Sequence, residues 1–195
     1  MTASPPTRGA ARTAAIMQAT LDLAQENGYA ALSIEAVAAR AGVGKNTIYR
    51  RWVSKGELFL DSLLSRNQPV LDFADTGDLL TDLREQAYAV TELLANGPWG
   101  PLYRALVAEA QHDPAVAAGL DERFIRPQTE RTVARVRLGQ EQGQVSPDVD
   151  LDLVMTILSG PLYYRLLIAR EPVSHEFIDS VFATLFAGLG PRERP

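Results

Sequence analysis

Apolar residues recur every three or four positions along most of the chain, and clusters of proline and glycine interrupt the pattern. This spacing places apolar side chains on one face of a helix, whereas the two-residue alternation of strands is scarce here. The pattern predicts an all-α protein with about nine helices. We place them at roughly residues 11–27, 33–41, 45–52, 54 onward, 78–95, 98–111, 114–142, 149–170 and 174–188.

The ends of the predicted helices carry residues with known capping preferences. Gly28 stops the first helix, and Ser33 is a candidate N-cap for the second. Ser54 and Glu57 form a candidate capping box at the start of the fourth. Pro127 cannot donate a helical hydrogen bond, so it should begin or kink a helix at its position.

The stretch from Ser33 to Leu58 carries the most specific pattern in the chain. Two short helices meet at Gly42-Val43-Gly44, and the second of them turns Ile48 and Trp52 inward while cationic and polar side chains face out. This is the arrangement of a helix-turn-helix, whose second helix lies in the major groove of DNA. The residues that we expect to contact DNA are Ser33, Lys45, Asn46, Thr47, Tyr49, Arg50, Arg51 and Lys55.

The residue types in this set suit DNA chemistry. Lys45, Asn46 and Thr47 occupy the N-terminal end of the reading helix, where lysine can pair with guanine, asparagine with adenine, and a threonine methyl can touch thymine. Lys55 begins the next helix, a natural place for a phosphate contact. The plain alternative is a solvated charged face, and the coincidence of the turn, the tyrosine and the capping box favours DNA reading over it.

The charge distribution supports a polyanionic partner at one end of the chain. The net charge is −5, which alone argues against nucleic acid. However, residues 1–56 hold seven Lys and Arg against three Asp and Glu, so this part is positive and the remainder is acidic. A basic head on an acidic body suits a protein that touches DNA with its head only.

Composition and motifs predict neither a cofactor nor an enzyme. The chain has no cysteine and no apolar run long enough to cross a bilayer, so we expect a cytoplasmic protein without disulfides or membrane contact. His112 and His175 lack partners at metal-ligand spacing. The string Gly42 to Thr47 resembles a phosphate-binding loop, but Ala39 and Asn46 stand where that motif needs glycine and Ser or Thr. We expect no metal, no cofactor and no catalytic residue.

Several motifs resemble the TetR/AcrR family of transcriptional regulators. They are Gly28-Tyr29, Leu32-Ser33, the run from Val37 to Val43, Thr47-Ile48-Tyr49, and the run from Ser54 to Leu58. Arg50-Arg51 departs from the family pattern, in which many members carry an aromatic residue or histidine, so the operator sequence stays open. His112-Asp113-Pro114 and the run from Ser159 to Arg165 resemble one C-terminal subtype of the family.

The resemblance implies a division of the chain by function. We expect a disordered basic arm over residues 1–10, a helix-turn-helix domain over 11–56, a helical effector-binding and dimerisation domain over 57–190, and a disordered tail over 191–195. The last two helices would form the dimer interface, with Leu158, Leu162, Leu166, Ile178, Phe182 and Leu185. The middle helices would enclose an effector pocket, with Phe59, Tyr88, Trp99, Tyr103, Phe124 and Tyr163 as candidates and plain core packing as the alternative for each.

The sequence therefore predicts a homodimeric, ligand-responsive transcriptional repressor. It would bind a near-palindromic DNA operator and release it when a small lipophilic effector binds. Activation in place of repression stays open, because both use the same head. The alternative from another class is a helical small-molecule carrier or enzyme that does not bind DNA.

Overall fold

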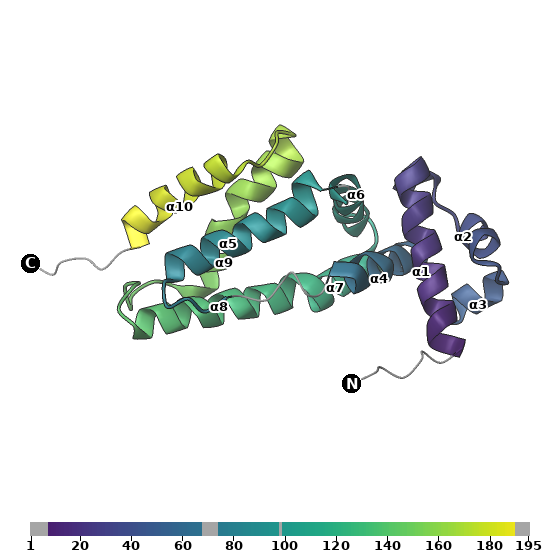
Figure 1. Cartoon of the computed structure of the whole chain (residues 1–195), viewed down its shortest axis with the longest axis horizontal. Coiled ribbons are helices and arrows are strands. Elements are labelled where there is room, and N and C mark those ends of the chain that lie inside the picture. Colours follow the sequence, from purple (N-terminus) through teal and green to yellow (C-terminus); the bar gives the residue numbers. More distant parts are fainter. Residues whose placement is uncertain (1–7, 68–73, 98, 190–195) are drawn as a thin grey trace, which may run out of the picture. The chain divides into compact units, whose positions relative to one another are not determined.

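The computed structural model describes residues 8–67, 74–97 and 99–189 of the chain. These residues are helical and contain no strand, which confirms the predicted all-α class (Figure 1). In chain order the elements are α1 (Arg8–Asn27), η1 (Tyr29–Ala31), α2 (Ile34–Ala41), α3 (Lys45–Tyr49), α4 (Lys55–Asn67), α5 (Leu79–Thr91), η3 (Glu92–Asn96), α6 (Gly100–Ala110), α7 (Pro114–Leu120), η4 (Asp121–Ile125), α8 (Arg126–Glu141), α9 (Leu151–Tyr163), η5 (Tyr164–Ala169) and α10 (His175–Leu189).

The long predicted helices contain π-helical segments that the sequence pattern does not reveal. The segments η4 and η5 lie within the spans predicted at 114–142 and 149–170, and η3 overlaps the end of the span predicted at 78–95. Each adds residues to a turn and rotates the side chains that follow it relative to a regular α-helix. Pro127 lies in the first turn of α8, directly after η4, so it begins a helix as expected.

Two predicted boundaries differ from the observed helices at the N-terminal end. The predicted helix over 45–52 ends at Tyr49, because the chain turns at Arg50 and Arg51. Helix α1 begins at Arg8, so residues 8–10, which we placed in a disordered arm, are helical. The rest of that arm and the predicted tail over 191–195 lie outside the described residues.

Contacts divide the chain into two compact units. The first comprises residues 1–67 and 101–121, and the second comprises 68–100 and 122–195. The first unit therefore contains α4, nearly all of α6 and α7 besides the helix-turn-helix. It is larger than the predicted 11–56 domain.

In the first unit, α1 packs on α2 and α4, and α4 packs on α7. The contact between α4 and α7 is close at two glycines. A Cβ on Gly56 would collide with Val116 of α7, and a Cβ on Gly119 would come within 2.6 Å of the Leu60 side chain of α4. A side chain at either position would force its neighbour to move, so glycine at both positions allows the two helices to pack this closely.

The second unit has its own apolar core, built where α5 meets α8 and α10 and where α9 meets α8 and α10. Figure 1 shows these four long helices. The buried residues of the core are Leu79, Leu83, Val136, Val145, Val154, Leu158, Val173, Ile178 and Phe182. Burying these side chains stabilises the unit by roughly 1.5–3 kcal/mol for each large residue.

A buried ion pair joins α5 to α8 inside the second unit. Asp82 and Arg135 are both almost fully buried, and Arg135 Nη2 lies 2.6 Å from an Asp82 carboxylate oxygen. The hydroxyl of Thr76 also donates to Asp82, at 2.6 Å. Burial acts to raise the pKa of Asp82, but the hydrogen bonds from Thr76 and Arg135 outweigh it and hold the pKa below its ordinary value.

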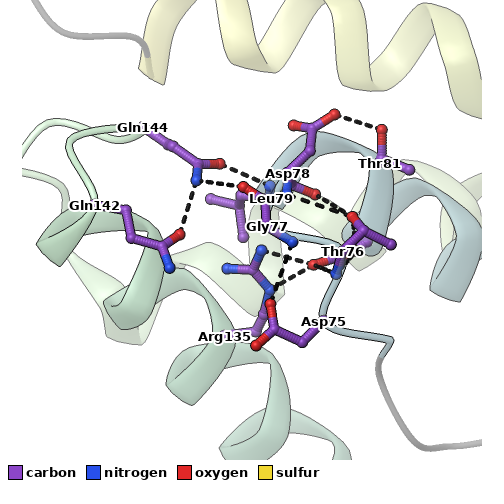
Figure 2. Close-up of polar contacts among 10 residues, drawn as sticks. Asp75, Thr76, Gly77, Asp78, Leu79, Thr81, Arg135, Gln142 and Gln144 are labelled. Carbon is purple, nitrogen blue, oxygen red and sulfur yellow. Dashed lines mark hydrogen bonds and ion pairs between the residues drawn. The ribbon is translucent and has the colours of Figure 1, made fainter.

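The start of α5 depends on a side chain from far along the sequence. Asp78 is the N-cap residue but makes no capping hydrogen bond with its side chain. Instead, Gln144 accepts a hydrogen bond from the Leu79 amide at 2.7 Å and donates to the Gly77 carbonyl at 2.9 Å (Figure 2). Gln144 therefore satisfies one of the free amides in the first turn of the helix.

Candidate nucleic-acid interface

The turn between α2 and α3 is fixed by local capping. The Ser33 hydroxyl accepts a hydrogen bond from the Ala36 amide at 3.1 Å, so Ser33 is the N-cap of α2 as predicted. At the other end of α2, Gly42 has φ 65°, a left-handed conformation that glycine adopts without strain. The Val43 amide then bonds back to the Ala38 carbonyl at 3.0 Å and closes the turn.

One side of the reading segment is buried in the head. Ile48 is fully buried, and Trp52 is 3% exposed. The indole of Trp52 also donates to the Asp61 carboxylate of α4 at 2.6 Å. These two side chains fix the rotation of α3 about its own axis.

The opposite side of the segment faces solvent. Lys45, Asn46, Tyr49 and Arg50 are exposed, with Tyr49 at 50%, and Thr47 is half-buried. A helix that buries Ile48 and exposes these polar residues has a layout that can enter a groove of DNA.

Lys45 already has a partner on the exposed face. Its ammonium group donates to the Glu35 carboxylate of α2 at 2.7 Å, and both side chains are more than half exposed. The hydrogen bond lowers the pKa of Glu35 and raises the pKa of Lys45, so both groups are charged at neutral pH. The sequence did not reveal this pair, because it depends on how α2 crosses α3.

Arg51 turns back toward α1 instead of extending along the reading face. Its guanidinium donates to the Thr13 hydroxyl at 3.0 Å and lies 5.4 Å from the centroid of the Trp52 ring. It borders a surface groove of about 540 Å³, whose lining residues are Ala10, Thr13, Ala14, Met17, Gln18, Leu21, Arg51, Ser62 and Ser65. Arg51 would have to exchange the Thr13 hydroxyl for a phosphate or a base to contact DNA.

Lys55 is half-buried in the first turn of α4 and is held by Tyr29. The ring of Tyr29 also packs against Phe59, with centroids 4.8 Å apart. Burial, followed by the nearby carboxylate of Glu109 on α6, raises the pKa of Tyr29 well above its ordinary value, so Tyr29 stays a neutral phenol. Its hydroxyl is buried without a well-aligned hydrogen bond among the described residues. Tyr29 thus connects the helix-turn-helix with α4 and α6.

The predicted capping box at the start of α4 is present with one change. The Ser54 hydroxyl accepts from the Glu57 amide at 3.1 Å, as the motif requires. The Glu57 carboxylate, however, accepts from the Val53 amide at 2.7 Å. Together these bonds fix the chain between α3 and α4.

Half of the predicted dimer-interface residues are buried in the core of the second unit. Leu158, Ile178 and Phe182 are at most 7% exposed, and Leu162, Leu166 and Leu185 pack against the same core. These residues therefore contribute to the fold of a single chain, and their part in a dimer interface stays a prediction. The large apolar side chains that α9 and η5 expose are Leu153, Tyr164 and Ile168, at 49%, 64% and 68%.

The six predicted pocket aromatics are divided between the two units. Phe59 and Tyr103 are almost fully buried in the first unit. Tyr88 belongs to the second unit, where its hydroxyl donates to Asp179 of α10 and its ring stacks on His175. Phe124 is buried there, and Trp99 and Tyr163 are half-buried.

Within the described ranges, no helix is long and apolar enough to cross a membrane. Over the same ranges, His, Asp and Glu side chains form no group of three that could hold a metal ion.

Two family models match the chain, and together they cover most of it. Residues 16–61 match the model described as "Bacterial regulatory proteins, tetR family". Residues 73–185 match the model described as "Tetracyclin repressor-like, C-terminal domain". The first match contains α2, α3 and the turn between them, which agrees with the geometry described above.

Individual relatives are similar over nearly their whole length. The uncharacterized HTH-type transcriptional regulator YdeS of Bacillus subtilis is 29% identical over 175 residues, 90% of this chain and 88% of that protein. The DNA-binding transcriptional repressor TetR of Mycobacteroides abscessus is 30% identical over 179 residues, 88% of this chain and 90% of that protein. Among solved structures, the TetR family transcription regulator SCO0332 matches with a TM-score of 0.76 and 34% identity, and covers 92% of this chain and 99% of its own.

Proposed function

Because this chain belongs to the tetR family of bacterial regulatory proteins, we propose that it is a homodimeric repressor that releases its DNA operator when a small molecule binds. Regulation of transcription through a DNA-binding helix-turn-helix follows from the family itself, and the chain is a regulator rather than an enzyme. The observation that carries the proposal is the face of α3, where Lys45, Asn46 and Tyr49 are exposed opposite a buried Ile48.

The exposed residues take different roles in the proposed complex. Lys45 and Asn46 lie at the N-terminal end of α3, where side chains meet base edges, and the half-buried Thr47 presents its methyl group. Tyr49 and Arg50 are one turn further along and are placed to reach phosphates.

The remaining predicted contacts are made at the edges of this face. Ser33 and Lys55 lie at the N-termini of α2 and α4, where free backbone amides favour a phosphate. The Ser33 hydroxyl already caps α2. We therefore assign the phosphate contact to the free backbone amides at this end of the helix. Arg51 would contact DNA only after its hydrogen bond to the Thr13 hydroxyl breaks.

Two copies of the chain would bind together. A two-fold dimer presents two α3 helices to half-sites about 34–36 Å apart on a near-palindromic operator. We assign the dimer contact to Leu153, Tyr164 and Ile168, because these are the large apolar side chains that α9 and η5 leave exposed. Leu162, Leu166 and Leu185 are partly buried and pack against the core of the second unit.

The effector would bind in the C-terminal body, whose family model is tetracycline repressor-like. Tyr88, Trp99, Phe124 and Tyr163 supply the aromatic surface of the proposed site, and a small lipophilic molecule fits that chemistry. Phe59 and Tyr103 are left out of it because they belong to the first unit. Effector and operator would oppose each other by about 1–3 kcal/mol, and the coupling is reciprocal.

Binding to the chain's own upstream DNA tests the proposal. Fluorescence anisotropy of labelled duplexes from that region, at two salt concentrations, should find a fragment that binds far more tightly than a random duplex of equal length. Fragments selected from genomic DNA should share a near-palindrome. A protein that binds neither duplex, or both equally, would favour the helical carrier that does not read DNA. Reporter expression in a deletion strain separates repression from activation.

A further inference from the structure

Glu35 places a negative charge on the face that we assign to DNA. It lies in the first turn of α2, it is exposed, and its carboxylate holds the ammonium group of Lys45 at 2.7 Å. Lys45 is the first residue of α3, where contacts to base edges are expected. A carboxylate at this point therefore competes with any bound duplex for the ammonium group of Lys45.

The head contains a second exposed ion pair that differs in one respect. Glu26, at the end of α1, accepts two hydrogen bonds from Arg40, at the end of α2, at 3.0 and 2.8 Å. Both carboxylates are exposed, and both are paired with a cation. Only Glu35 is paired with a residue of α3, so the two pairs separate the effect of position from the effect of charge.

The Glu35–Lys45 pair should affect the affinity for operator DNA and the affinity for other sequences differently. An ammonium group has three donors, so Lys45 can keep Glu35 on one of them and still offer two to guanine O6 and N7. On DNA of the wrong sequence Lys45 has only phosphates to contact. There the carboxylate competes with the phosphate for the ammonium group, with no base contact to offset the competition.

We propose that Glu35 is a specificity-determining residue, which lowers the affinity of the protein for non-operator DNA by holding Lys45 away from phosphates. This inference rests on the proposed DNA-binding function. Glu35 would discriminate against non-operator sequences, while Lys45 would supply the attraction to the operator.

The test compares Glu35→Gln with Glu26→Gln in the full-length protein. Each substitution changes the net charge by the same amount and keeps the shape of the side chain. Glu35→Gln should raise the affinity for a random duplex by about fivefold and steepen its salt dependence by up to about 0.9, the value of one additional phosphate contact. Affinity for the selected operator should change by less than about twofold, so the ratio of the two affinities falls. Glu26→Gln should leave that ratio unchanged.

A second comparison tests whether Glu35 acts through Lys45. In a Lys45→Met background, adding Glu35→Gln should change the affinity for random DNA by no more than Glu26→Gln does. The inference would be overturned if Glu35→Gln and Glu26→Gln changed the affinity for random DNA equally. It would also be overturned if Glu35→Gln lowered the affinity for the operator by as large a factor as it changed the affinity for random DNA. Circular dichroism checks that each variant is folded. Failure of the wild-type protein to prefer any duplex would instead overturn the proposed function itself.

Discussion

The ammonium nitrogen of Lys55 lies 4.4 Å from the centroid of the Tyr29 ring and 3.4 Å from the Tyr29 carbonyl oxygen. This contact joins the first turn of α4 to the segment that follows α1. It holds the cation in one place and leaves the side chain half-buried. Lys55 therefore has a structural role in the head besides the phosphate contact that we propose for it.

Replacing Lys55 with methionine should separate these two roles. Loss of the cation–π contact should lower the free energy of unfolding by about 0.5–1 kcal/mol, measured by urea denaturation. If Lys55 also contacts a phosphate, affinity should fall evenly on operator and random DNA, and the salt slope should drop by about one unit. A lower stability with an unchanged slope would restrict Lys55 to its contact with Tyr29.

Lys45→Ala should weaken operator binding by about 1–3 kcal/mol and relax the preference at one base position, because a base contact is lost. Binding to a set of operators with single base changes measures the relaxation. Asp22→Ala, an exchange in α1 away from the reading helix, is a control for general effects of substitution. Equal losses on operator and random DNA would show that Lys45 contacts a phosphate and not a base.

The exposed and buried apolar residues of the C-terminal helices should respond differently to a charge. Tyr164→Asp combined with Ile168→Asp should give folded monomers, because both side chains are exposed in the single chain. Phe182→Asp should instead lower the stability by more than about 3 kcal/mol, since it would place a charge in the core of the second unit. Sedimentation velocity and circular dichroism distinguish the two results. A persistent dimer of the double variant would move the interface elsewhere.

The Asp82–Arg135 pair should make the stability depend on acid pH. The pKa of Asp82 is depressed in the folded protein, so its contribution is present above the ordinary Asp pKa and is lost as the pH falls below about 4. Asp82→Asn should therefore lower stability most at neutral pH, by about 3–5 kcal/mol, because Arg135 is left buried and unpaired. Urea midpoints at pH 7, 5 and 3.5 should converge between wild type and variant as the pH falls. A constant difference would contradict the depressed pKa.

The helix-turn-helix could be predicted in detail because its signals are local. The Ser33 hydroxyl caps α2 through the amide of Ala36, three residues later in the sequence. Gly42 itself adopts the left-handed conformation that ends this helix. The partners of the basic residues could not be predicted in the same way. Arg51 and Thr13 are 38 residues apart, and their contact exists only once α1 packs beside the turn.

The C-terminal helices illustrate a different limit. Helices α9 and α10 carry apolar residues on more than one face, so periodicity does not say which face is the core. The π-helical segment η5 then rotates the residues after Tyr163, which brings Tyr164 and Ile168 to the surface. We predicted an interface at Ile178 and Phe182 from the resemblance to the family, and within a single chain both side chains are buried.

Two glycines, one in α4 and one in α7, restrict how these two helices can move relative to each other. At Gly56 and Gly119 the backbone of one helix lies so close to a side chain of the other that an added Cβ would collide with it. We therefore expect α4 and α7 to move together as a rigid body. Any displacement of α7 would in this way also move Gly56, Lys55 and the start of α4.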